Sequence, residues 1–217
     1  MKTDTQVQQD VLAELNWQPS VNAAKIGVEV KDGIVTLAGH VDSYAEKWDA
    51  ERASQRVAGV RALATEIDVA LPGSSRRNDV DIARAAESAL QWTTFLPKDS
   101  VKIMVEGGWV TLTGEVNWEY QRQSASAAVR YLIGVTGVCD QIAIKPKVTA
   151  VAVKSDIEAA LKRHAHGDAQ KILVSVSGGD VTLTGTVPNW SERDKARNSA
   201  WATPGLKSVV DNINIGY

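Results

Sequence analysis

The chain has 217 residues, 44% of them hydrophobic, and a formal net charge of −2. This charge balance disfavours a dedicated nucleic-acid-binding protein, which would usually carry a basic surface. The single cysteine, Cys139, excludes an intrachain disulfide. No segment approaches the run of about 18 apolar residues that a membrane-spanning helix needs.

The first expected element is a helix over residues 4–16, capped by Thr3 or Asp4 and closed by Pro19. Residues 25–38 then alternate between apolar and polar, which predicts a two-stranded hairpin with one buried face. Its turn, Asp32-Gly33, can adopt positive φ at low cost, and we expect its second strand to end at Gly39. A helix over 43–57 and a strand over 65–69 complete the unit.

The order helix–strand–strand–helix–strand recurs twice. The second unit is predicted to have a helix at 79–92, strands at 101–106 and 109–113, a helix at 118–132 and a strand at 140–144. The third is predicted to have a helix at 155–165, strands at 172–177 and 180–184, a helix at 189–202 and a strand at 209–215. Structural glycines recur at the hairpin turns, strand ends and helix ends: Gly33, Gly39, Gly59, Gly108, Gly114, Gly134, Gly179, Gly185 and Gly205.

A repeat of this kind predicts three tandem units rather than one large domain. We place them at residues 1–70, 79–145 and 154–217, with linkers at 71–78 and 146–153. The expected fold class is α+β, in which two helices cover one face of a three-stranded mixed sheet in each unit. A unit of about 65 residues is only marginally stable alone, so the units are expected to lean on each other or on a second chain.

The motifs VTLAG (35–39), VTLTG (110–114) and VTLTG (181–185), with the later pairs Gly59-Val60, Gly134-Val135 and Gly205-Leu206, carry a family resemblance. The chain resembles the BON domain, the small module of bacterial osmotic-stress and nodulation-type envelope proteins, over nearly its whole length. The resemblance implies a helix-on-sheet fold, no enzymatic activity, and binding of phospholipid or envelope components. It also implies a role in osmotic or envelope stress, and some members are transport-associated.

Candidate binding residues are few. Trp118 and Trp190 lie near helix starts and Trp109 follows a hairpin turn, so their indoles could anchor the chain at a membrane interface. The alternative for them is packing within or between units. Arg76-Arg77, an adjacent basic pair in the first linker, could meet lipid phosphates. Other basic residues are expected on solvated helix faces: Lys47, Arg52, Arg56, Arg122 and Arg130.

No catalytic or cofactor motif is recognisable in the sequence. His164, His166 and Asp168 are metal-ligand types, but residues i and i+2 do not share a helix face, and histidines are favourable at a helix end. We therefore expect no metal and no cofactor. Cys139 is expected to be a small buried hydrophobic residue.

We expect a non-enzymatic binding or scaffold protein that engages phospholipid or envelope components. The alternative is an oligomer-forming, transport-associated protein whose units assemble into a ring or pore-like body. The expected partners are a phospholipid surface, a second copy or envelope proteins, and not nucleic acid. The polar start MKTDTQVQQDVLAELNW lacks the apolar core of a signal peptide. This predicts a cytoplasmic location, or a periplasmic or membrane-associated one if a leader has been removed.

Overall fold

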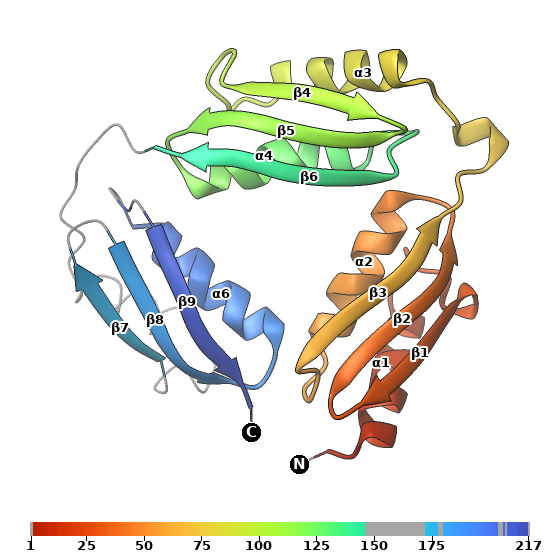
Figure 1. Ribbon diagram of the computed structural model, residues 1–217, viewed down its shortest axis with the longest axis vertical. Coiled ribbons are helices and arrows are strands. Elements are labelled where there is room, and N and C mark those ends of the chain that lie inside the picture. Colours follow the sequence, from red (N-terminus) through yellow and green to blue (C-terminus); the bar gives the residue numbers. More distant parts are fainter. Residues whose placement is uncertain (1, 146–171, 178–179, 204–205, 207, 217) are drawn as a thin grey trace.

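The computed structural model describes residues 2–145, 172–177, 180–203, 206 and 208–216 (Figure 1). It contains three three-stranded sheets, and each described helix of a unit lies behind its sheet in this view. The predicted fold class is confirmed, because each sheet is mixed and belongs to one of three tandem α+β units.

The first unit contains α1 (Asp4–Trp17), β1 (Ile26–Lys31), β2 (Ile34–Val41), α2 (Tyr44–Gln55) and β3 (Ala62–Val69). Strand β2 is central, antiparallel to β1 and parallel to β3. Helix α1 contacts β1, and α2 contacts β3 and α1. The two helices therefore cover one face of the sheet, as the alternating sequence predicts.

The second unit contains α3 (Asp79–Gln91), β4 (Val101–Glu106), β5 (Trp109–Val116), α4 (Glu119–Arg130) and β6 (Gly137–Ile144). The third contains β7 (Ile172–Ser177), β8 (Asp180–Val187), α6 (Trp190–Trp201) and β9 (Ser208–Ile215). The helix predicted over 155–165 lies outside the described residues. Two short 3-10 turns, Ala23–Lys25 and Gly73–Ser75, occupy the loop before β1 and the first linker.

In the first and second units, the first helix is fastened to the hairpin turn of the same unit. Thr3 caps α1, which leaves the Asp4 carboxylate free to accept hydrogen bonds from the N–H groups of Asp32 and Gly33 at 2.8 and 3.0 Å. In the second unit, Asp79 accepts from Gly107 and Gly108, both at 2.9 Å. These bonds satisfy turn amides that the sheet cannot reach.

The predicted end of the second strand is wrong. Gly39, Gly114 and Gly185 each lie inside a strand that continues for two more residues. Gly114 pairs with Val101 and Ile142, yet its φ is +132°. A Cβ there would lie 2.1 Å from the Ser100 carbonyl oxygen. The glycine thus permits close backbone approach within the strand rather than ending it.

Seven of the predicted structural glycines have positive φ: Gly33, Gly39, Gly59, Gly108, Gly114, Gly134 and Gly185. Gly179 and Gly205 lie outside the described residues. The last strands β3 and β6 begin three residues earlier than predicted, at Ala62 and Gly137. They do so because parallel pairing runs the full length of the central strand, from Ile34↔Ala62 to Val41↔Val69 in the first unit.

Each unit has a separate hydrophobic core between sheet and helices. The predicted inward positions of the central strand are fully buried in all three units: Val35, Leu37, Val110, Leu112, Val181 and Leu183. The three units stand at the corners of a triangle whose inner sides carry the edge strands β3, β6 and β9 (Figure 1). None of the described helices is long and apolar enough to cross a bilayer.

Candidate functional site

The three units meet through the second helix of each, in junctions that follow one pattern. The first residues of these helices are Tyr44, Glu119 and Trp190. Trp190 of the third unit packs against the core of the first unit, and Tyr44 of the first unit packs against the core of the second. The first residue of the second helix therefore packs against another unit in two of the three units.

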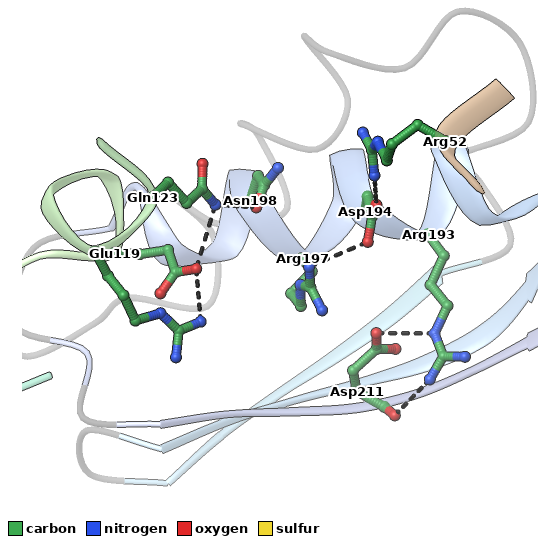
Figure 2. Close-up of polar contacts among 9 residues, drawn as sticks. Arg52, Glu119, Gln123, Arg193, Asp194, Arg197, Asn198 and Asp211 are labelled. Atoms are coloured by element: carbon green, nitrogen blue, oxygen red, sulfur yellow. Dashed lines mark hydrogen bonds and ion pairs between the residues drawn. The ribbon is translucent and has the colours of Figure 1, made fainter. Parts of the chain in front are cut away.

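Polar contacts continue this pattern one helical turn further along, at Trp48, Gln123 and Asp194. Asp194 forms an ion pair with Arg52 of the first unit. Gln123 Nε2 donates to Asn198 Oδ1 of the third unit at 3.0 Å. The Arg130 guanidinium of the second unit lies 3.7 Å from the centroid of the Trp48 ring. The units thus join head to tail, first to second, second to third and third to first, in a closed ring (Figure 2 shows the last two junctions).

The junction between the second and third units contains a buried carboxylate. Glu119 is only 4% exposed. Its Oε1 accepts from Arg122 at 2.8 Å and from Gln123 at 3.2 Å, but no described residue bonds its buried Oε2. Both bonds come from residues of its own helix, so one oxygen of this buried carboxylate is held within α4.

Burial also raises the pKa of two residues of α2, of which Tyr44 lies at the junction between the first and second units. Burial raises the pKa of Tyr44, and the Glu51 carboxylate adds to this, while Arg130 and the Val138 amide act against it. Burial likewise raises the pKa of Glu51, opposed by Lys47 and by the Thr65 hydroxyl. In both residues burial is the largest cause of the raised pKa.

The basic residues expected on solvated helix faces are bound to other groups of the protein. Lys47 donates to the Ile67 carbonyl at 2.8 Å. Arg52, Arg56 and Arg122 pair with Asp194, Glu14 and Glu119, while Arg130 stacks on Trp48. These side chains therefore hold helices and units together and do not present a separate basic surface.

Arg76 and Arg77 lie exposed in the first linker and fold back on it. Arg76 donates to the Leu71 carbonyl at 3.4 Å, and Arg77 donates to the Ser74 and Arg76 carbonyls at 3.0 and 2.8 Å. The stem of Arg77 also covers Gly134, where an added Cβ would lie 2.8 Å from the Arg77 Cβ. The pair thus bonds the linker to itself and packs it against the second unit. Contact of Arg76 and Arg77 with lipid phosphates stays a prediction.

Trp190 lies in the junction between the third and first units. Besides packing against the first core, its ring has the Arg193 guanidinium 5.0 Å from its centroid. Arg193 in turn donates to Asp211 at 2.9 Å (Figure 2). The indole is therefore partly buried in this junction, where it contributes to packing between units.

Trp109 lies on the outer face of the second sheet and is 50% exposed. Its ring covers Gly137 of β6, where an added Cβ would lie 2.2 Å from the indole. Ile34 and Asp180 begin the corresponding strands of the other units. Only the second unit therefore has an aromatic residue at this place.

Trp118 stands where the equivalent helices have a capping residue. Ser43 and Asn189 cap α2 and α6 by accepting a backbone N–H. An indole has no acceptor for this bond, so Trp118 gives up an interaction that typically contributes about 1 kcal/mol. Gln121 compensates in part, because its Oε1 accepts from the Trp118 N–H at 3.1 Å and its Nε2 donates to the Phe95 carbonyl at 2.9 Å.

Phe95, Trp118 and Tyr120 form an aromatic cluster at one end of the second unit. The Phe95 and Tyr120 rings meet edge to face with centroids 5.9 Å apart, and the Trp118 and Tyr120 centroids are 6.4 Å apart. Phe95 is 61% and Tyr120 50% exposed. Phe95 and Tyr120 were not among the predicted binding residues. Comparison of the repeats could have found them, because the equivalent positions 75 residues earlier are Ser20 and Ala45, which are not aromatic.

The five predicted binding residues do not form one site. The structure separates them into the linker, the outer sheet face, the aromatic cluster and a junction. No group of three or more metal-ligand side chains occurs in the described part of the chain, and His164 and His166 lie outside it. The expectation of a buried cysteine is wrong: Cys139 is half-buried because it pairs with Thr111 on the outer sheet face.

These features define a class of protein made of small α+β modules that repeat in tandem and join through their second helices. The chain belongs to the BON domain family, whose model matches residues 3–70, 78–146 and 149–217. It is 27% identical over 144 residues to "Osmotically-inducible protein Y" of Escherichia coli (strain K12), a match that covers 63% of this chain and 72% of the relative.

Two solved structures are similar to the chain at low identity. The C-terminal domain of CdsD, described as the structural protein of the type III secretion system of Chlamydia trachomatis, matches with a TM-score of 0.26 and 15% identity, covering 100% of each chain. The PrgH periplasmic domain matches with a TM-score of 0.22 and 16% identity, covering 89% of this chain and 96% of its own.

Proposed function

We propose that this chain is a non-enzymatic binding protein that attaches to phospholipid surfaces during osmotic or envelope stress. Family membership and the osmotically inducible relative support the stress context. The observation that carries the lipid contact is the aromatic cluster, whose exposed rings stand where another unit of the same chain has smaller residues. Tryptophan, tyrosine and phenylalanine suit the headgroup region of a bilayer, because their bodies are apolar and two of them have a polar tip.

The charge distribution predicts how such binding responds to salt. The basic helix residues pair with other groups of the protein. We therefore expect attachment by burial of apolar rings, which depends little on ionic strength, rather than by attraction to anionic headgroups.

Flotation of the purified chain with liposomes tests this proposal. The double variant Phe95→Ala/Tyr120→Ala removes two exposed rings, while Trp17→Ala removes an indole that is 83% exposed on the first unit. We expect the wild type and Trp17→Ala to float with zwitterionic vesicles at low and high salt, and the double variant to remain behind. Absence of flotation for the wild type, or equal flotation of the double variant, would overturn the proposal.

Self-association is the second proposal, and the head-to-tail junction is the observation that favours it. A heterologous contact that closes within one chain can also join units of different chains. Light scattering over a wide concentration range tests this. A mass that rises with concentration, and that Arg52→Ala alters, supports assembly through the junction, whereas a constant monomer mass removes it.

A further inference from the structure

A groove lies between helix α3 and the edge strand β4 of the second unit. Two adjoining hollows of about 600 and 550 Å³ share Glu87, Asp99, Val101 and Ile103 in their linings. They therefore form one continuous groove along the helix and the strand. Its lining includes the apolar side chains of Ala83, Leu90, Leu96, Val101 and Ile103.

In the first unit, a side chain of helix α1 fills the position that is equivalent to this groove. Gln8, four residues after the start of α1, donates from its Nε2 to the Val28 carbonyl of β1 at 2.7 Å. Val28 is the third residue of an edge strand, so this amide covers an open strand edge. Natural proteins commonly protect such edges in this general way.

The second unit lacks that cover. Ala83 stands four residues after the start of α3, and Ile103 is the third residue of β4, but a methyl group cannot donate a hydrogen bond. No described side chain makes the equivalent bond to Ile103. The edge of β4 therefore faces the groove with backbone groups that no described residue bonds.

The strand register shows which backbone groups are open. The Ser100 carbonyl accepts from Glu115 of β5 at 3.1 Å, which directs the alternate residues Val101, Ile103 and Val105 toward the outer edge. In a strand, the N–H and C=O of one residue point to the same side. This edge thus offers donors and acceptors at every second residue, beside apolar side chains. In Figure 1, β4 is the outermost strand of its sheet.

We propose that this groove binds an extended polypeptide segment, which adds to β4 as a further strand. A peptide backbone can satisfy the open donors and acceptors, while its alternate side chains meet the apolar lining. An acyl chain would fill the same volume but leave the backbone groups of β4 unsatisfied, which opposes its binding. The proposal is independent of lipid contact by the aromatic cluster, which lies on other residues.

The substitution Ala83→Gln closes the groove with the side chain that the first unit already uses there. Because Gln8 occupies this position in a folded unit, the variant is expected to fold. Ala85→Gln is the matched control, since it makes the same substitution at an exposed position of the same helix. Circular dichroism and thermal unfolding of both variants establish that each is folded.

The probe is a fluorescein-labelled peptide of alternating valine and threonine, as long as the six residues of β4. Fluorescence anisotropy measures its binding, and amide chemical shifts of Val101, Ile103 and Val105 locate it. We expect the wild type and Ala85→Gln to bind, and Ala83→Gln to bind at least about tenfold more weakly, which corresponds to about 1.4 kcal/mol. A peptide with the same side chains but with every internal amide N-methylated is expected to lose binding.

Four results would overturn the assignment. The first is that the wild type does not bind the peptide, and the second is that Ala83→Gln binds as the wild type does. The third is equal binding of the N-methylated peptide, which would show that backbone pairing is not involved. The fourth is wild-type self-association that Ala83→Gln abolishes without peptide, which would place a second copy of the chain in the groove.

Discussion

Arg52 of α2 and Asp194 of α6 form an ion pair although 142 residues separate them in the sequence. The second oxygen of Asp194 forms an ion pair with Arg197 at 3.1 Å, so this carboxylate, only 17% exposed, is held from two sides (Figure 2). A partly buried pair is screened less by salt than a surface pair. This contact closes the third unit onto the first, where no linker joins them.

Replacing Asp194 with alanine is therefore expected to loosen the ring. The lost pair contributes about 1 kcal/mol, and the Arg52 guanidinium can regain water because it is partly exposed. Small-angle X-ray scattering should show a larger radius of gyration than for the wild type. Asp81→Ala, which breaks an exposed pair with Arg84 within one helix, is the control. An unchanged scattering curve for Asp194→Ala would contradict this role of the pair.

Trp118→Ser is expected to raise stability and to lower membrane attachment. Serine at this position can cap α4 as Ser43 caps α2, which contributes about 1 kcal/mol. The same change removes one ring from the aromatic cluster. Urea unfolding should show the gain, and liposome flotation should fall about fivefold or more, the factor that corresponds to about 1 kcal/mol.

The two measurements on Trp118→Ser distinguish two roles for the indole. If the ring serves only packing, the variant is less stable and floats as the wild type does. Trp17→Ala again provides a comparison, since Trp17 is exposed and lies outside the cluster.

Gly114→Ala is expected to destabilise the second unit by about 3 kcal/mol. The glycine has φ of +132°, and an added Cβ would lie 2.1 Å from the Ser100 carbonyl oxygen. Neither the backbone conformation nor the contact can be relieved by moving a side chain. Gly73→Ala, with no atom within 4 Å of the added Cβ, should change the free energy of unfolding by less than about 0.5 kcal/mol. Equal unfolding of the two variants would contradict this account of the strand.

The raised pKa of Glu51 predicts that the stability of the folded protein depends on pH. Burial raises its pKa above the ordinary 4.5, so the folded protein holds this proton more tightly than the unfolded chain does. The resulting stability is fully present below the unfolded pKa and is lost as the pH rises through the folded pKa. Glu51→Gln stays neutral, so it should be more stable than the wild type at about pH 7 and lose this advantage below about pH 4.

Urea unfolding at the two pH values measures this difference for Glu51→Gln. Glu66→Gln, which removes a carboxylate from an exposed position of β3, is the comparison. A stability advantage of Glu51→Gln that is the same at both pH values would show that the titration of Glu51 is not its cause.

The sequence predicted each described α-helix and β-strand of the three units, though not the two 3-10 turns, because the determinants of these elements are local. Alternation of apolar residues marks the central strand, as at Val35 and Leu37, which are buried. The dipeptide Asp32-Gly33 marks the hairpin turn, and both of its residues have positive φ. The prediction that the strand ends at Gly114 failed, since a glycine that ends a strand and one that permits close backbone approach look alike in sequence. Either Thr3 or Asp4 was predicted to cap the first helix: Thr3 caps it, and the Asp4 carboxylate instead bonds the hairpin turn 28 residues away.

The sequence by itself determined that this protein is three repeated α+β units, because periodicity, turn dipeptides and recurring glycines act over a few residues. Only the tertiary structure decided how the units meet and which surfaces remain. The pairing of Arg52 with Asp194 depends on the packing of helices far apart in the chain, and either residue alone reads as a charge on a solvated helix. Likewise, Phe95 meets Tyr120 where Gln121 bonds the Phe95 carbonyl and so holds its loop against α4.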